Sequence, residues 1–353
     1  MSRFIAASLR ESGFSVLAKT TGSKPVIILP DGKEEEIERK GLPTILEEKK
    51  VLKRGASLGV QALVTELMSI QPESSFVESR RILRPHILVI TNVRLDHREQ
   101  MGLTKPEIAR SLASAILPQA TVFVPDEEFY PEFQSAADKV KAKIIRVKRN
   151  DTGEWGEPGG ISAFFYFEEN LRLALAVSKH LGVPKEAALQ GIAKAEPDFG
   201  SLRIWEAELG TPPAPWLLVS AFAANDPEST GLILARIKNG LSLPGQRLVG
   251  ILNFRQDRGD RTLQWINALE QGYFSGFHKL FFIGAHVHAL RMKGGSNLLP
   301  AFTPITAKSP AAIMENIGQE VDGGAILVGI GNMGGLGAPL VEHWEKIGRP
   351  YEP

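Results

Sequence analysis

Short apolar runs alternate with stretches of helical periodicity along the first part of the chain. The runs of strand length are Ser15–Lys19, Val26–Leu29, Ala62–Leu67, His86–Asn92, Thr121–Val124 and Lys143–Val147. The stretches of helical periodicity are Leu46–Leu58, Pro106–Leu117, Glu132–Val140, Glu168–Leu181 and Lys185–Ala195. Continuously apolar strands separated by helices predict a parallel sheet that is covered on both faces.

A second series of the same kind follows Glu196–Ser201, where proline, aspartate and glycine lie close together. Its predicted strands are Arg203–Leu209, Trp216–Ala221, Arg247–Leu252, Lys279–Ile283 and Ala325–Ile330. Its predicted helices are Pro227–Ile237, Pro310–Gly318 and Ala338–Ile347. The pattern therefore predicts an α/β protein of two domains, residues 1–200 and residues 201–353.

The first residues already follow a helical pattern, because Phe4, Ile5, Leu9 and Phe14 alternate with polar positions. Domains seldom open in a helix that no strand or capping segment precedes. We therefore expect either that Met1 is a true start or that the chain has lost its beginning.

Composition excludes several classes of protein. The 41 basic residues balance 40 acidic ones, so no broad positive field favours nucleic acid as a partner. Cysteine is absent, which excludes disulfides, thiolate metal sites and a cysteine nucleophile and fits a reducing cytosol. No apolar run reaches the ~20 residues that span a bilayer, so the chain as given is expected to be soluble.

Polar residues follow two predicted strands of the first series, at the edge where open α/β sheets bind ligands. Glu66 could hold a Mg²⁺ ion that is shared with a nucleotide phosphate, or it is a solvated residue between strand and loop. Asn92, Asp96 and His97 follow the strand Ile87–Ile90 and could ligate a metal, orient a phosphate or relay a proton. The ordinary alternative for Asp96 and His97 is a hydrogen bond within the loop.

The second series carries further candidates. Asp226 is expected to cap the helix that follows it, and with Asn225 it could instead bind a ligand at that helix N-terminus. Arg255, Arg258 and Arg261 also follow a strand. They form either a self-paired charged surface or a site that recognises a carboxylate or phosphate.

A dinucleotide-like fingerprint, G-x-G-x-x-G, is formed by Gly329, Gly331 and Gly334. A genuine fingerprint leads into another strand with an acidic residue ~20 positions on. No further strand is expected before Pro353, so we interpret the segment as a tight turn and not as a NAD site.

Taken in order, these segments resemble the Mur-ligase superfamily of ATP-dependent amide ligases. Thr65–Glu73 and Ile90–His97 are similar to the core of the superfamily's central domain. Within the superfamily the chain is most similar to the poly-γ-glutamate synthases of bacterial capsule formation. Further matching stretches are Lys19–Gly22, Phe222–Thr230, Asn253–Thr262 and Gly329–Asn332.

The resemblance implies a central ATP-binding domain followed by a Rossmann-like ligase domain, with ATP and Mg²⁺ as cofactors. Glu66 and His97 would hold the metal, and Arg203 would reach the terminal phosphate. Asp96 and Asn92 would act with Arg203 at the reaction centre.

The resemblance also assigns residues to the other ligands. Asn170, Asn225 and Asp226 would hold adenosine. The candidates for contact with glutamate or the polymer are Thr20, Thr21, Arg255, Arg258 and Arg261; for the arginines, charge and position are the reason.

The resemblance implies that ATP phosphorylates a glutamate γ-carboxylate and that a glutamate amine attacks the acyl phosphate. The partners implied are glutamate, the growing poly-γ-glutamate and membrane-embedded capsule-synthesis subunits, at the inner face of the membrane, with a homo-oligomer as a further option. Two alternatives stay open: another ligase of the superfamily, of the folylpolyglutamate or cell-wall type, and a non-catalytic scaffold subunit.

The chain departs from the family's pattern at three places. It contains no G-x-x-x-x-G-K-[S/T] phosphate loop and no apolar N-terminal membrane segment, both of which the family carries ahead of the first helix. It also has no lysine after His97 where many Mur ligases carry a carbamylated metal ligand. We therefore expect that the natural protein extends upstream of Met1 or that this variant has impaired activity.

Overall fold

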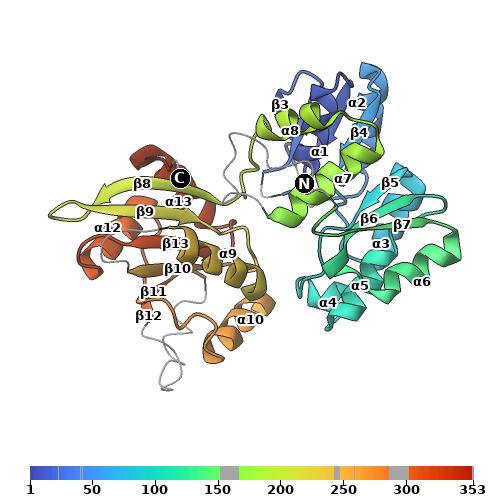
Figure 1. Cartoon of the computed structure of the whole chain (residues 1–353). Helices are drawn as coiled ribbons and strands as arrows, with labels where there is room; N and C mark the ends of the chain where they lie inside the picture. The colour runs from blue at the N-terminus through green and yellow to red at the C-terminus, as the bar shows by residue number, and fades with distance from the viewer. Residues whose placement is uncertain are drawn as a thin grey trace. The chain divides into compact units, whose positions relative to one another are not determined.

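The computed structural model describes residues 1–353 except 23, 40, 42, 152–166, 242–246, 258, 286–301 and 352–353. The described chain divides into two compact units, Met1–Phe199 and Gly200–Pro353, whose elements are labelled in Figure 1. Among these residues, no helix combines the length and the apolar composition that crossing a membrane requires.

The first unit contains two sheets. One sheet joins, in this order, β3 (Glu34–Glu36), β2 (Val26–Ile28), β1 (Val16–Lys19) and β4 (Ala62–Thr65). Only β1 and β4 are parallel in it, because β2 and β3 pair antiparallel. The other sheet is parallel throughout and joins β5 (Ile87–Val89), β6 (Thr121–Pro125) and β7 (Lys143–Val147).

Helices cover these sheets and close two apolar cores. The helices are α1 (Ser2–Glu11), α2 (Glu47–Leu58), α3 (Pro72–Val77), α4 (Arg98–Met101), α5 (Lys105–Ala113), α6 (Pro131–Val140), α7 (Glu168–His180) and α8 (Lys185–Ala193), with a π-helical turn at Glu78–Leu83 and a 3-10 turn at Asp126–Glu128. One core joins α1, α7 and α8 to β1, and Ile5, Leu175 and Ile192 are buried in it. The other packs Ile108 of α5 and Phe133 of α6 against the β5–β6–β7 sheet (Figure 1).

The second unit is built on one sheet of seven strands. In order they are β12 (Phe302–Pro304), β11 (Lys279–Gly284), β10 (Leu248–Phe254), β13 (Ile326–Gly331), β9 (Ala214–Ser220), β8 (Arg203–Leu209) and β14 (Arg349–Pro350). The strands from β12 to β9 are parallel, and β8 and β14 add antiparallel pairs at one edge. The helices are α9 (Pro227–Gly240), α10 (Gly259–Glu270), α12 (Pro310–Glu320) and α13 (Gly337–Ile347). Every residue of β13 is buried, as expected for a central parallel strand.

The predicted α/β class is confirmed, but the first unit contains two sheets, one of them mixed, where one parallel sheet was expected. β3 consists of three exposed glutamates, so no apolar alternation marks it. β14 contradicts the expectation that no strand follows the glycine-rich turn. It pairs antiparallel with β8, however, and so does not complete the βαβ unit of a dinucleotide site.

Candidate functional site

The carboxyl ends of β1 and β4 bring three candidate residues together, because these strands are parallel and in register from Val16 to Lys19. The backbone N–H of Thr21 donates to Glu66 Oε2 over 2.8 Å, and Thr21 Oγ1 lies 3.3 Å from the same oxygen. Thr20 is buried, and its hydroxyl has no hydrogen-bond partner among the described residues. A carboxylate and an unsatisfied hydroxyl therefore share one edge of the sheet.

A second carboxylate that sequence reasoning missed lies near this edge. A Cβ on Gly22 would lie 3.3 Å from Asp198 Oδ1, which places this carboxylate beside the loop that follows β1. Arg3 pairs with Glu34, and Arg3 Nε lies 3.5 Å from Asp198 Oδ2. Burial is the largest single effect and lowers the pKa of Arg3, but the hydrogen bonds and negative charges of Glu34 and Asp198 together raise this pKa on balance. Asp198 is thus a further carboxylate beside this edge, and it already has a guanidinium nearby.

A buried ion pair lies directly behind the two strand ends. Lys19 precedes Thr20, and its ammonium group pairs with Glu48 of α2; both side chains are fully buried. Thr65 Oγ1 donates to Glu48 Oε2 over 3.1 Å. Burial raises the pKa of Glu48, against the opposing effect of Lys19. Since Glu48 holds the last residue of both strands, it fixes the positions of the residues that follow them.

The candidates after β5 form their own small cluster. The backbone N–H of His97 donates to Asp96 Oδ1 over 2.8 Å, and His97 Nε2 lies 3.6 Å from Asp96 Oδ2. Arg94 pairs with Glu128. Asn92 Nδ2 lies 3.5 Å from the hydroxyl of the preceding threonine. Within the described ranges, no group of three or more His, Asp or Glu side chains gathers as a metal cluster, so Glu66 and His97 stay a predicted pair.

The residues predicted to contact adenosine lie at helix starts. Asn170 is half-buried in the first turn of α7. Asp226 is buried and caps α9, because its Oδ1 accepts from Ser229 N over 2.8 Å. Thr230 Oγ1 donates to the carbonyl of Ala224 over 3.1 Å and ties down the loop before the cap. The capping role of Asp226 is therefore established, and its role toward a nucleotide stays a prediction.

The carboxyl ends of β10 and β13 are joined by an amide pair. Asn253 Nδ2 donates to the carbonyls of Asn332 and Gly334 over 2.6 and 2.8 Å, and Asn332 Nδ2 donates to the Asn253 carbonyl over 3.0 Å. Both asparagines are buried, and Asn253 Oδ1 has no partner among the described residues. Arg261, on α10 and also buried, donates to Asn332 Oδ1 over 3.4 Å.

The glycines of the fingerprint serve this junction. Gly331 has a φ of +98°, and a Cβ there would lie 2.7 Å from the Asn253 carbonyl oxygen. A Cβ on Gly334 would lie 2.6 Å from the guanidinium of Arg255, which is itself paired with Asp257 over 2.7 Å. The turn therefore lets Arg255 approach the backbone closely.

One of the predicted arginines lies elsewhere in the second unit. Arg203 begins β8, where it pairs with Glu345 and lies over the ring of Trp205 at 5.2 Å. Arg258 lies outside the described residues.

These two edges differ in what they can bind. The first offers a carboxylate and hydroxyls, the hard oxygen donors that suit a divalent cation. The second offers arginine N–H groups beside amides, which suit a carboxylate or phosphate. Neither Glu48 nor Asp198 was found from the sequence. A glutamate on the buried face of α2, in line with Val51 and Gly55, was the one available signal for the first of them.

Comparison with known proteins points to one family. Residues 208–347 match the model of the poly-gamma-glutamate synthase CapB C-terminal domain. The PGA synthase CapB of Bacillus subtilis (strain 168) is 32% identical over 349 residues, which cover 97% of this chain and 86% of that protein. The capsule biosynthesis protein CapB of Bacillus anthracis is 31% identical over 269 residues, which cover 75% of this chain and 56% of that protein.

A solved structure shows the same fold. It is a bifunctional folylpolyglutamate synthase/dihydrofolate synthase from Yersinia pestis, complexed with AMPPNP and a Mn ion. The match has a TM-score of 0.67 at 14% identity and covers 97% of this chain and 84% of that one. At this identity the likeness establishes the fold.

Proposed function

The chain belongs to the CapB family of poly-γ-glutamate synthases, and on this premise we propose that it is an ATP-dependent ligase that joins glutamates through γ-amide bonds. The observation that carries the proposal is the 32% identity to a PGA synthase over nearly the whole chain. The shared fold with a folylpolyglutamate synthase supports it, since that protein was solved with an ATP analogue and a divalent metal.

The proposed reaction activates a carboxylate, which is a poor electrophile. The terminal phosphoryl group of ATP passes to the γ-carboxylate of a glutamate, and ADP leaves. The amine of a second glutamate then attacks the acyl carbon and expels phosphate. The protein has mainly to position the reactants and to stabilise the charge that moves between them.

The first unit offers the residues for the metal. The hydroxyl of Thr20, to which no described residue is hydrogen-bonded, the hydroxyl of Thr21 and the carboxylate of Glu66 are oxygen donors of the kind that Mg²⁺ prefers. Bound there, the ion would neutralise phosphate charge. We propose Asp96 and His97 as a second pair that orients the phosphates or the ion.

The remaining candidates divide between nucleotide and amino acid. We propose that Asn170 and Asn225 contact adenosine, with Asp226, whose second carboxylate oxygen is the one a ribose hydroxyl would use. Arg203 would stabilise the transferred phosphoryl group. Arg261, held by Asn332 at the end of β13, would bind a glutamate carboxylate together with Arg255.

We place the enzyme on the cytoplasmic side of the membrane, where ATP and glutamate are available, with membrane-embedded capsule-synthesis subunits as its partners. The supporting observation is the family's link with capsule biosynthesis.

The test is substrate dependence in the full-length gene product that contains this chain. We expect ADP release that requires glutamate and Mg²⁺, and a product whose linkages resist peptidases specific for α-peptide bonds. ADP release that requires a pterin or a UDP-sugar would instead identify another ligase of the superfamily. Absence of ADP release under all these conditions would favour a scaffold subunit.

A further inference from the structure

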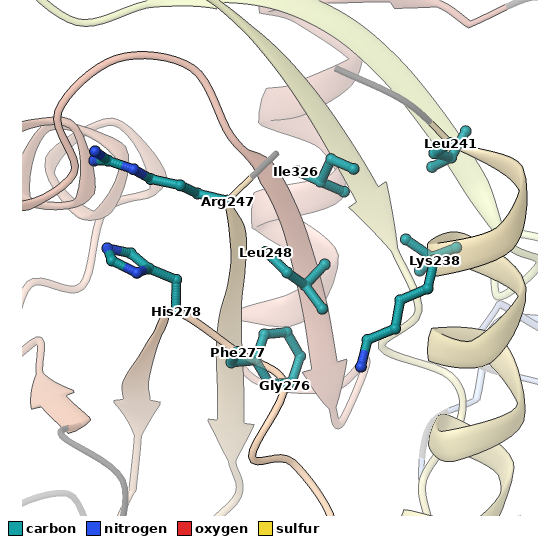
Figure 2. A pocket seen from close by; sticks show the side chains of 9 residues that line it. Lys238, Leu241, Arg247, Leu248, Gly276, Phe277, His278 and Ile326 are labelled. Carbon is teal, nitrogen blue, oxygen red and sulfur yellow. The ribbon is translucent and has the colours of Figure 1, made fainter. Parts of the chain in front are cut away.

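A cavity of ≈340 Å³ lies in the second unit, at the amino-terminal ends of the parallel strands (Figure 2). Leu248 begins β10, Ile326 begins β13, and His278 directly precedes β11. The reaction candidates of this unit, Asn225, Asp226 and Arg255, follow the carboxyl ends of β9 and β10. The cavity therefore lies at the opposite end of this sheet from the reaction candidates of the second unit.

The cavity is positively charged. Its lining residues are Ile237, Lys238, Leu241, Arg247, Leu248, Gly276, Phe277, His278 and Ile326, none of them acidic. Arg247 donates one hydrogen bond, to the Asp322 carbonyl over 2.9 Å, which leaves other N–H donors of its guanidinium. Lys238 and His278 have no side-chain hydrogen-bond or ion-pair partner among the described residues. Lys238 and Arg247 are therefore cations without a carboxylate partner among the described residues.

The floor of the cavity is apolar. Ile237, Leu241, Phe277 and Ile326 are all buried. Figure 2 shows Lys238 extending from α9 toward Gly276 and Phe277, while Arg247 and His278 lie beside one another on the other side of Leu248. Cations thus stand on two sides of an apolar surface.

We propose that this cavity binds a segment of γ-linked glutamate polymer, away from the reaction site; the inference rests on the proposed function. Each residue of such a polymer carries a free carboxylate and a pair of methylene groups. Successive carboxylates would pair with Lys238 on one side and with Arg247 and His278 on the other, while the methylene groups cover the apolar floor. A second contact of this kind keeps a growing chain on the enzyme between additions.

The binding test uses the full-length protein without ATP and a synthetic γ-linked glutamate pentamer as the calorimetric probe. We expect Lys238→Gln to weaken binding about fivefold, because it removes a charge contact at the surface. The double variant Arg247→Gln/His278→Gln should weaken binding by a similar factor for the same reason. Gly276→Ala should weaken binding too, since its Cβ would lie 2.3 Å from Lys238 Nζ and displace that side chain. The matched control is Lys346→Gln, which removes an exposed lysine of α13 and should leave binding unchanged.

Other probes separate this site from a general anion site. An α-linked glutamate pentamer should bind more weakly, because its carboxylates lie on longer side chains and at a different spacing. The proposal is overturned if the α-linked pentamer binds equally, if inorganic phosphate displaces the γ-linked pentamer at equal concentration, or if Lys238→Gln binds like the wild type.

Polymer length separates this inference from the proposed function. Lys238→Gln should release ADP at the wild-type initial rate but make shorter polymer. If the wild type releases no glutamate-dependent ADP, the proposed function fails. If it does so and the variant makes polymer of unchanged length, only the polymer-binding cavity is refuted.

Discussion

The two units differ in the buried polar groups at the carboxyl ends of their parallel strands. Behind the ends of β1 and β4 lies a fully buried ion pair, Lys19 with Glu48. At the ends of β10 and β13 lie two neutral amides, Asn253 and Asn332, which bond to each other's backbone. A buried charge is costly once its single partner is removed, whereas each hydrogen bond of a neutral amide contributes less to stability. The first edge should therefore be the more vulnerable to a single substitution, and the second the more sensitive to added volume.

The largest effect is expected at the buried ion pair. Lys19→Met should destabilise the first unit by about 3–5 kcal/mol, because it leaves Glu48 buried without its cation. Hydrogen exchange measured by mass spectrometry should show faster exchange in β1 and β4 and unchanged exchange in β10 and β13. Lys24→Met is the control, since the Lys24–Glu36 pair is exposed and contributes at most ~1 kcal/mol. Equal effects of the two variants would contradict the contrast between the edges.

Added volume should disturb the central strand β13 of the second unit. A Cβ on Gly329 would lie 2.2 Å from Cζ of the buried Phe222, so Gly329→Ala should cost about 1–3 kcal/mol through overpacking. Gly231→Ala is the control, because no atom of another described element lies within 4 Å of its Cβ position. The midpoint of urea unfolding, followed by tryptophan fluorescence, measures both. A Gly329→Ala midpoint equal to that of the control would show that β13 has space for the added methyl group.

A smaller effect separates structure from function at Asp226. Asp226→Ala should cost about 0.5–2 kcal/mol through loss of the α9 cap, and Asp226→Asn should retain most of that stability. If Asp226 also contacts ribose, Asp226→Asn should raise the KM for ATP while the unfolding midpoint stays near that of the wild type. An unchanged KM would leave the residue with its capping role alone.

The smallest effect is a pH dependence in the first unit. Hydrogen bonds from the backbone N–H groups of Thr104 and Leu103 lower the pKa of Glu107 in the capping box of α5. A carboxyl with a lowered pKa adds stability above its ordinary pKa of ~4.3 and loses it as the pH falls through the folded value. Unfolding midpoints between about pH 6 and pH 3 should fall less steeply for Glu107→Gln than for the wild type. Parallel pH profiles would remove Glu107 as a source of acid sensitivity.

The sequence predicted those elements whose apolar residues recur with the period of a strand or a helix. Lys143–Val147 and Arg203–Leu209 form the strands expected of them, residue for residue. The helix α10 was missed because its first turn belongs to an arginine-rich stretch that looked like exposed surface, although Arg261 is buried there. Periodicity cannot show that a charged residue is buried when its partner is distant.

The candidate site likewise contains residues that could be placed from the sequence and residues that could not. Its position at the strand ends follows from the alternation of strands and helices, which places Thr21 and Glu66 side by side. Glu48 and Asp198 could not be placed in this way, because their partners come from remote parts of the chain. Which residues share an edge can be predicted from the order of strands, but which charges neutralise one another depends on tertiary packing.

The central claim, that Glu66 holds the metal of an ATP-dependent glutamate ligase, is tested most directly by the rate of glutamate-dependent ADP release. We predict that Glu66→Gln in the full-length gene product lowers kcat by roughly 100-fold or more, because a metal ion contributes several kcal/mol of charge stabilisation. Glu186→Gln, an exposed position on α8, should retain the wild-type rate. A folded Glu66→Gln protein that releases ADP at the wild-type rate in saturating Mg²⁺ would contradict the claim.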